Sequence, residues 1–194
     1  MTKGEETRKL IVEKSAELFN TKGYDACSMS DIMKVTGLKK GGLYNHFSSK
    51  EDLSVEAFDY MFSLIFQMFR KHLDEKKTSI DKLSGIIDAF EELIVSSPIK
   101  GGCPVGNAAV FANQDHPILQ AKAKVAFRKL IDYVSIKIQE GMDDEEFNCN
   151  LNVELESVSF VSSLEGATLM SRVYGDLKHF QLVKKSLVNR INEW

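Results

Sequence analysis

The chain has 194 residues, of which 43% are hydrophobic and 27% are charged, a balance that is ordinary for a globular protein. Its formal net charge of -3 excludes a protein that binds nucleic acid through its total charge alone. A nucleic-acid-binding surface must therefore be a local concentration of Lys and Arg side chains.

The cysteines and the apolar segments narrow the class of protein further. Cys27, Cys103 and Cys149 are widely spaced and form no CxxC pair, which argues against a disulfide framework or a zinc site. The first residues lack the apolar core of a signal peptide, and no stretch approaches the roughly 20 apolar residues of a membrane span. We therefore expect a cytoplasmic protein with no cofactor, no metal site and no membrane partner.

The apolar residues recur at helical spacing through most of the chain, and only 3 prolines interrupt them, so we expect an all-α fold. The first helix is predicted at about 3–21, where Ile11, Ala16 and Phe19 lie on one face. Gly23 follows it, and glycine is the residue that most often ends a helix.

Two short helices are predicted next, at about 28–37 and 39–47. Ser28 opens the first of them, with Asp31 three residues later in an arrangement close to a capping box. Gly37 permits the tight turn that separates the two helices. A long helix is then predicted at about 50–73.

The rest of the chain is predicted to form five more helices, which brings the expected total to about nine. Their approximate ranges are 80–96, 105–113, 115–141, 152–175 and 177–193. The clearest break among them is Gly101-Gly102-Cys103-Pro104, because Gly and Pro interrupt regular structure.

The helix predicted at 152–175 is apolar on two opposite faces, and such a helix is buried on two sides. One face carries Leu151, Leu155, Val158, Leu169 and Val173, and the other carries Val153, Phe160, Leu164, Ala167 and Tyr174. The helix predicted at 177–193 carries one apolar stripe. We expect these two helices to form a four-helix homodimer interface, and a large monomer core is the alternative.

The segment 28–47 has the pattern of a helix-turn-helix that reads DNA. Lys39 and Lys40 stand at the start of its second helix, where the helix dipole favours a phosphate. Tyr44, Asn45 and His46 supply hydrogen-bonding groups on a helix short enough for the major groove. A solvated surface that only happens to carry two lysines is the alternative.

An ordered series of residues surrounds this segment. It comprises Thr7-Arg8, Leu18-Phe19, Gly23-Tyr24, Ser28, Asp31-Ile32, Gly37-Leu38, Lys40-Gly41, Leu43-Tyr44, His46-Phe47 and Ser49-Lys50-Glu51-Asp52-Leu53. In order and spacing the series resembles the tetracycline-repressor-like (TetR) family of regulators over about residues 5 to 65. The block LYNHFSSKEDL is the most specific part of the resemblance.

The resemblance implies a DNA-binding head at 1–50, built of three helices, and a ligand-binding and dimerisation body at 51–194. It implies a homodimer on a palindromic operator, usually a repressor that a small molecule releases. The residues to which it assigns DNA contacts are Thr7, Ser28, Lys40, Tyr44, His46 and Lys50, with Asn45 as a candidate base reader. Lys39 and Gly42 depart from the family pattern, and Gly41-Gly42 would let the helix approach DNA closely.

The body should hold an apolar cavity for a hydrophobic, aromatic or electrophilic effector. The residues predicted to line it are Phe62, Phe66, Phe90, Cys103, Asn107, Phe111 and Phe127. Gly101 to Asn107 also resembles a motif of a TetR subgroup that responds to aromatic or electrophilic compounds. Cys103 is either a reactive sensor thiol or a small buried residue beside the cavity.

Two other classes of protein are weighed against the regulator. A thiol-dependent enzyme would use Cys103, but no catalytic Ser/His/Asp or Cys/His arrangement can be placed from the sequence. A helical interaction module without DNA binding is compatible with the departures at Lys39 and Gly42. The ligand-responsive DNA-binding regulator is the favoured interpretation.

Overall fold

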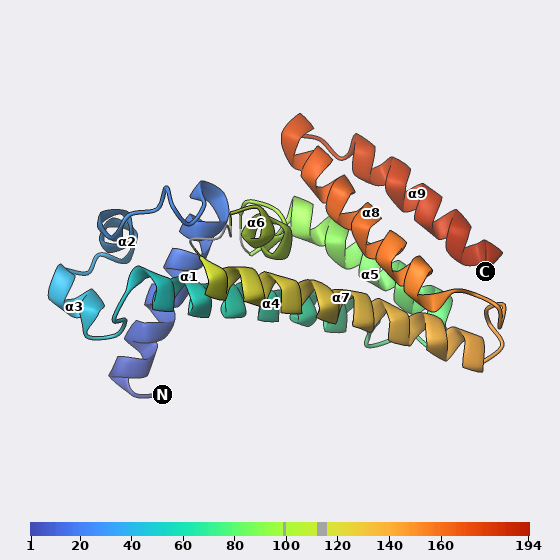
Figure 1. Cartoon of the computed structure of the whole chain (residues 1–194), viewed down its shortest axis with the longest axis horizontal. Helices are drawn as coiled ribbons and strands as arrows, with labels where there is room; N and C mark the ends of the chain where they lie inside the picture. Colours follow the sequence, from blue (N-terminus) through green and yellow to red (C-terminus); the bar gives the residue numbers. More distant parts are fainter. Residues whose placement is uncertain (99, 112–115) are drawn as a thin grey trace. The chain divides into compact units, whose positions relative to one another are not determined.

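The computed structural model describes residues 1–98, 100–111 and 116–194, and within these residues the chain forms helices and no strands (Figure 1). This confirms the all-α fold class. The helices are α1 (Lys3–Lys22), α2 (Met29–Thr36), α3 (Lys40–Tyr44), α4 (Lys50–Leu73), α5 (Ser79–Val95), α6 (Pro104–Phe111), α7 (Pro117–Asp143), α8 (Val153–Tyr174) and α9 (Lys178–Glu193).

The chain divides into two compact units, which are residues 1–64 with 99–124, and residues 65–98 with 125–194. Both α4 and α7 therefore contribute to both units. The first unit contains α1, α2, α3 and α6, so its limits differ from the head at 1–50 expected from the sequence. The assignment of DNA binding to the head, and of ligand binding and dimerisation to the body, stays a prediction.

Local capping explains where the first helices begin and end. Ser28 forms a complete capping box with Asp31, because each residue's side chain accepts a hydrogen bond from the other residue's main-chain N–H. Gly37 ends α2, as the sequence predicted, and it adopts the left-handed conformation. In contrast, α3 ends at Tyr44 and not near Phe47, and its N-cap residue Lys39 makes no side-chain capping bond.

The core of the first unit holds α1, α2, α3 and the start of α4 together. Ile11, Ala16, Ile32, Leu43 and Leu53 are fully buried there. α1 packs against α2 and also against α6, which is nearly a hundred residues away in the chain. The predicted end of α6 at Asn113 lies outside the described residues.

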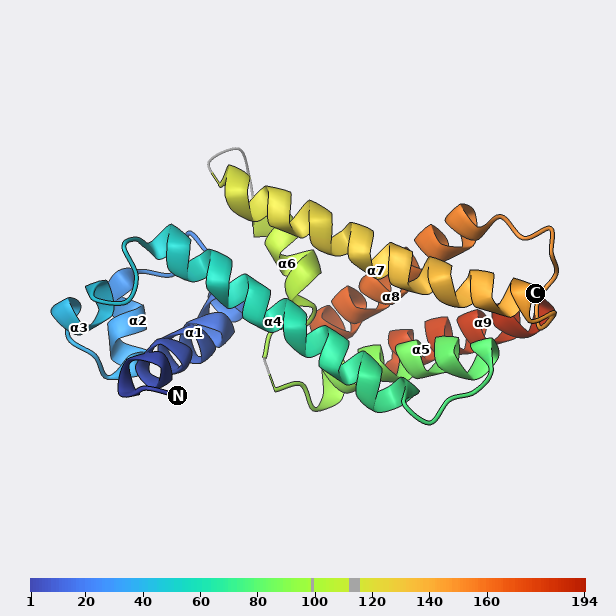
Figure 2. The same ribbon diagram turned by 90° about the horizontal axis from the view of Figure 1, so that it is seen from below.

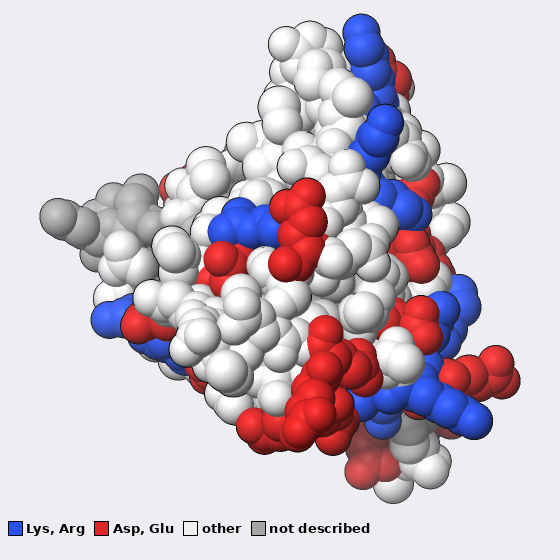
Figure 3. Space-filling model, turned by 90° about the vertical axis from the view of Figure 1, so that its right-hand side faces the viewer, with Lys and Arg blue, Asp and Glu red and all other residues white. Residues whose placement is uncertain are grey.

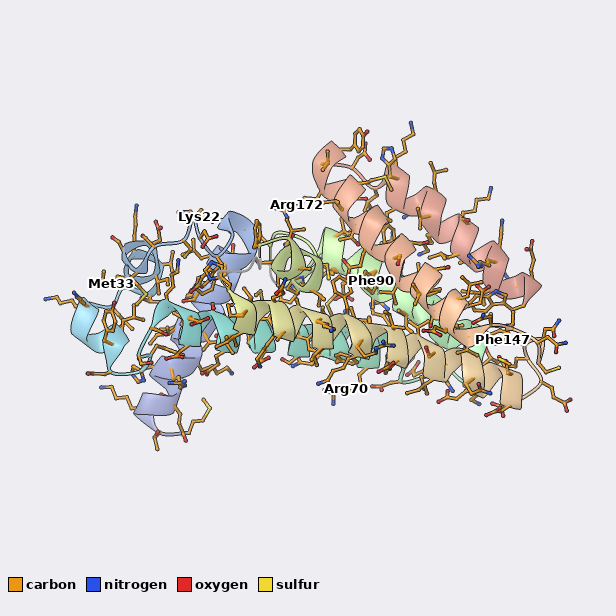
Figure 4. All side chains as sticks on the ribbon, viewed as in Figure 1. Lys22, Met33, Arg70, Phe90, Phe147 and Arg172 are labelled. Atoms are coloured by element: carbon orange, nitrogen blue, oxygen red, sulfur yellow. The ribbon has the colours of Figure 1, made fainter. Side chains whose placement is uncertain are left out.

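In the second unit, α8 and α9 lie side by side, and α5 packs against both (Figures 1 and 2). Phe90 of α5 points into this unit (Figure 4), where its ring lies 6.0 Å from that of Phe69. On the face seen in Figure 3, acidic side chains gather in a cluster and basic side chains lie beside it.

Candidate nucleic-acid interface

The turn between α2 and α3 is fixed by hydrogen bonds within the chain. The hydroxyl of Thr36 donates to the carbonyl of Ile32 at 2.7 Å, and it accepts from the N–H of Leu38 at 3.4 Å. Gly37 between them has a φ of 72°, a backbone conformation that glycine adopts without strain. The two helices are thus held at a defined angle, as a helix-turn-helix requires.

The outer side of α3 carries the side chains that the sequence singled out. Lys39, Lys40, Gly41, Tyr44 and Asn45 are all exposed, whereas the intervening Leu43 is fully buried. The Lys40 amine lies 5.8 Å from the centre of the Tyr44 ring, so these two side chains share one edge of the helix. This edge offers positive charge, a phenol and an amide to one ligand.

The end of α3 is held by Arg8 of α1, a residue to which the sequence reasoning gave no role. The Arg8 guanidinium donates to the main-chain oxygen of His46 and lies 4.1 Å from the centre of the Phe47 ring. It also pairs with Glu56 of α4, at 3.2 Å from Nε to Oε1 and 2.5 Å from NH2 to Oε2. One side chain therefore joins α1, the segment that follows α3, and α4.

Lys50 is also turned inward. Its amine donates to the main-chain oxygens of Tyr24 and Cys27, at 2.9 and 3.0 Å, and lies 4.2 Å from the centre of the Tyr24 ring. These contacts attach the loop between α1 and α2 to the start of α4. They differ from the exposed phosphate contact that the family resemblance implied for this lysine, and that role stays a prediction.

The hydroxyls of Ser28 and Thr7 are engaged in helix contacts. Ser28 donates to Asp31 at 2.8 Å, and Thr7 donates to the main-chain oxygen of Lys3 at 2.9 Å. The Ser28 main-chain N–H, which donates to the Asp31 carboxylate, lowers the pKa of Asp31 to about 2, with help from the Ser28 hydroxyl and Lys22. Both hydroxyls contribute to the helix ends, and a phosphate contact by either stays a prediction.

The predicted effector residues are distributed between the two units. Asn107 and Phe111 line a cavity in the first unit. Cys103 is buried in the loop before them, and Phe62 stacks on Phe58 with ring centres 6.1 Å apart. In the second unit, Phe66 and Phe90 each pack against Phe69, and Phe127 is half-buried on α7.

One residue at this cavity, Asn20, was missed by the sequence reasoning. Asn20 is almost fully buried at the end of α1, and its side-chain oxygen accepts from the Asn107 amide at 2.9 Å. The Asn20 amide donates to the main-chain oxygens of Lys100 and Gly102, at 2.8 and 3.0 Å. The Gly101 to Asn107 motif is therefore attached to α1, a contact that no local sequence signal reveals.

Other kinds of site find no support in the residues that the structure describes. No group of three or more His, Cys, Asp or Glu side chains is arranged there to hold a metal ion. None of the helices in that part of the chain is long and apolar enough to cross a membrane. Cys27 and Cys103 are buried, and Cys149 is exposed.

Comparison with known families gives two matches that together span most of the chain. Residues 11–57 match the family described as "Bacterial regulatory proteins, tetR family". Residues 79–187 match the family described as "Tetracyclin repressor-like, C-terminal domain". The first match contains α2 and α3, and the second runs from α5 into α9.

Individual proteins are similar to this chain over nearly its whole length. A crystal structure of a TetR transcriptional regulator from Chloroflexus aurantiacus is 30% identical, with a TM-score of 0.94 over 98% of this chain and 96% of that one. The repressor DhaR from a Mycobacterium species is 24% identical and covers 86% of this chain and 82% of its own. The regulator CifR, a cysteine mutant bound to operator DNA, is 15% identical with a TM-score of 0.85, covering 93% of this chain and 94% of that one.

Proposed function

The chain belongs to the TetR family of bacterial transcription regulators and is not an enzyme, and on this premise we propose that it is a ligand-responsive repressor. In the proposed cycle it binds a palindromic operator as a homodimer in the cytoplasm. A small hydrophobic or aromatic effector then releases it from DNA.

The exposed edge of α3 is the observation that carries the proposal. Lys39 and Lys40 provide positive charge for phosphates, and Tyr44 provides a hydroxyl next to them. Asn45 is exposed at the end of the helix, where an amide can read the edge of a base. CifR, which shares this fold, was crystallised with operator DNA, and that supports the same use of the fold here.

The proposed homodimer forms through α8 and α9. Phe160, Leu164 and Ala167, from one of the two predicted apolar faces of α8, are buried within the chain, whereas Tyr174 of the same face is exposed. The other face remains uncovered, with Leu155, Leu169 and Val173 exposed to 56, 60 and 72%. Exposed apolar residues that share one face of a helix favour an interaction surface, and the same face of a second copy would cover them.

An apolar effector is favoured over an electrophile that modifies Cys103. The Cys103 side chain is only 4% exposed, and a buried thiol is usually inert. Many of the residues predicted to line the effector cavity are aromatic, and aromatic side chains suit flat hydrophobic molecules. DhaR, a relative of this chain, is a repressor, which supports repression as the direction of control.

The proposal is tested by selecting duplexes from a random-sequence pool with the purified protein, followed by footprinting of the selected sequence. We expect a protected palindrome and an affinity that falls steeply with salt concentration. Lys39→Gln/Lys40→Gln should weaken binding to all sequences, and Lys76→Gln/Lys77→Gln, which changes two adjacent exposed lysines between α4 and α5, is the matched control. A chain that selects no sequence, or a double α3 variant that binds like the control, contradicts the proposal.

A further inference from the structure

We propose that Arg8 and Glu56 are positioning residues for sequence recognition, because together they fix the angle at which α3 and the segment after it are presented to DNA. Neither side chain touches DNA in this role. The inference rests on the proposed function, since it concerns the same DNA-binding surface. Both residues and the whole of α3 belong to the first unit.

α3 is too short to hold its own orientation. It has five residues, Lys40–Tyr44, and its N-cap residue Lys39 makes no side-chain capping bond. A helix of this length is not stable by itself in water, so its position depends on contacts with the rest of the unit. Leu43 and Phe47 provide two such contacts, because both side chains are buried. Apolar contacts are non-directional, and they hold α3 in the unit without by themselves fixing its angle.

The side chains proposed to contact DNA at the end of α3 lie between these two anchors. Tyr44 and Asn45 are exposed, and His46 follows them directly. The N–H of His46 donates to the main-chain oxygen of Leu43 at 3.0 Å, which attaches His46 to α3. The main-chain oxygen of His46 in turn accepts from the Arg8 guanidinium. The position of that guanidinium therefore sets the direction in which Tyr44 and Asn45 point.

Arg8 is itself fixed by two further contacts. The Glu56 carboxylate accepts from its Nε at 3.2 Å and from its NH2 at 2.5 Å, and a bidentate pair of this kind fixes the plane of the guanidinium. The Phe47 ring lies over the same group, with its centre 4.1 Å from the guanidinium carbon. The remaining nitrogen, NH1, is then directed at the His46 oxygen. A planar group with several donors can make these contacts together, whereas a lysine ammonium cannot.

The Arg8–Glu56 pair contributes more to geometry than to stability. The two side chains are 43 and 40% exposed, and exposed ion pairs add little to the free energy of folding. α1 and α4 are held in the unit by buried residues of their own, such as Ile11 and Leu53. Loss of the pair should therefore leave the unit folded and change the orientation of α3. Base contacts require well-placed partners, so they are more sensitive to this change than the attraction to phosphates.

The experiment measures two dissociation constants for each full-length variant, one with the duplex that the wild type selects and one with a random-sequence duplex of equal length. Their ratio is the specificity of the chain. Partial unfolding lowers both affinities by the same factor, and loss of a phosphate contact weakens binding nearly uniformly across sequences. Only a change in how bases are read changes the ratio.

Glu56→Gln separates the effect of charge from the effect of position. If charge alone mattered, removal of a carboxylate from the DNA-binding unit would strengthen binding to any DNA. We expect instead that affinity for the selected duplex falls and that the ratio drops roughly fivefold or more, which is the contribution of one good base contact. Glu6→Gln at an exposed position of α1 removes the same charge and should leave the ratio unchanged.

Arg8→Lys keeps the charge and removes the planar guanidinium. A lysine still binds phosphate, so a direct contact between this residue and the DNA backbone would survive the substitution. We expect the ratio to fall at least as far as in Glu56→Gln, with an unchanged salt dependence of binding to the random duplex. Lys9→Arg, at the exposed neighbouring position, makes the reverse exchange and should retain the wild-type ratio.

Two results would overturn the inference. They are a wild-type ratio in Glu56→Gln and a wild-type ratio in a folded Arg8→Lys chain. If circular dichroism shows that Arg8→Lys does not fold, Glu56→Gln decides the question by itself. A wild-type chain that selects no sequence contradicts the proposed function, whereas a selective wild type with equally selective variants contradicts only the positioning role.

Discussion

The amine of Lys50 lies 2.9 Å from the main-chain oxygen of Tyr24 and 4.2 Å from the centre of its ring. One lysine at the start of α4 thereby supports the loop that leads into α2. The same lysine belongs to the block that most resembles the TetR family, where the expected role was a phosphate contact. Its two possible roles, support of the head and direct contact with DNA, make different predictions.

The substitution Lys50→Gln should destabilise the fold while leaving the salt dependence of DNA binding unchanged. Loss of the amine leaves two half-buried main-chain oxygens without their donor, which costs about 1–3 kcal/mol of unfolding free energy. Urea denaturation measures this loss. Lys40→Gln is the control, since an exposed lysine should change stability by less than about 0.5 kcal/mol but reduce the salt slope by about 1. If Lys50→Gln instead makes DNA affinity depend less steeply on salt concentration, Lys50 contacts a phosphate.

Asp31 should make the stability of the chain depend on pH in the acid range. Its hydrogen bonds to Ser28 and its pair with Lys22 lower its pKa to about 2 in the folded state. A group with a depressed folded pKa contributes stability above its unfolded pKa, and this contribution is lost as the pH falls through the folded value. Thermal melts should therefore lose stability between about pH 4 and pH 2.

Replacement of the carboxylate isolates this contribution. Asp31→Asn should be less stable than the wild type at pH 7 and should approach it at pH 2, because the wild type then carries a protonated Asp31 as well. Asp132→Asn on the exposed side of α7 makes the same change of charge and should track the wild type. If the wild type and Asp31→Asn lose thermal stability in parallel as the pH falls, Asp31 is not the cause of the acid dependence.

Gly101 should not tolerate even an alanine. Its φ is 108°, a conformation that side chains with a Cβ rarely adopt, and the added atom would lie 2.7 Å from the Asn20 main-chain oxygen. Gly101→Ala should therefore destabilise the chain by more than about 1 kcal/mol in urea. Gly4→Ala in α1, where the nearest atom is 3.9 Å away, should be neutral or stabilising. Equal stability of the two variants would exclude the close approach of Gly101 to α1.

A charge on the uncovered face of α8 should dissociate the proposed homodimer. Leu169→Glu places a carboxylate on a residue that is 60% exposed in the single chain and would be buried in the dimer. Sedimentation equilibrium should give a dimer for the wild type and a monomer, or a much weakened dimer, for this variant. Val110→Glu on α6, where the residue is 80% exposed, should remain dimeric. A wild-type monomer at micromolar concentration would contradict this interface.

Much of the fold and part of the candidate site were predictable from neighbouring residues alone. Helix ends at Ser28 and Gly37 follow from capping bonds between residues a few positions apart, which a sequence displays directly. The two apolar faces of α8 follow from helical periodicity, and the structure buries one of them through Phe160 and Leu164. The exposure of Lys39, Lys40 and Tyr44 follows in the same way from the burial of Leu43.

The sequence by itself determined an all-helical chain with two short helices joined by a turn at Gly37, because those features depend on spacing and on local hydrogen bonds. Only the tertiary structure decided that Lys50 and Arg8 bind main-chain oxygens of other segments, and that Asn20 pairs with Asn107 across 87 positions. It also decided that the predicted aromatic residues divide between two units. A side chain's partners from distant helices depend on how those helices pack, and the periodicity of each helix states which face is apolar but not which helix will cover it.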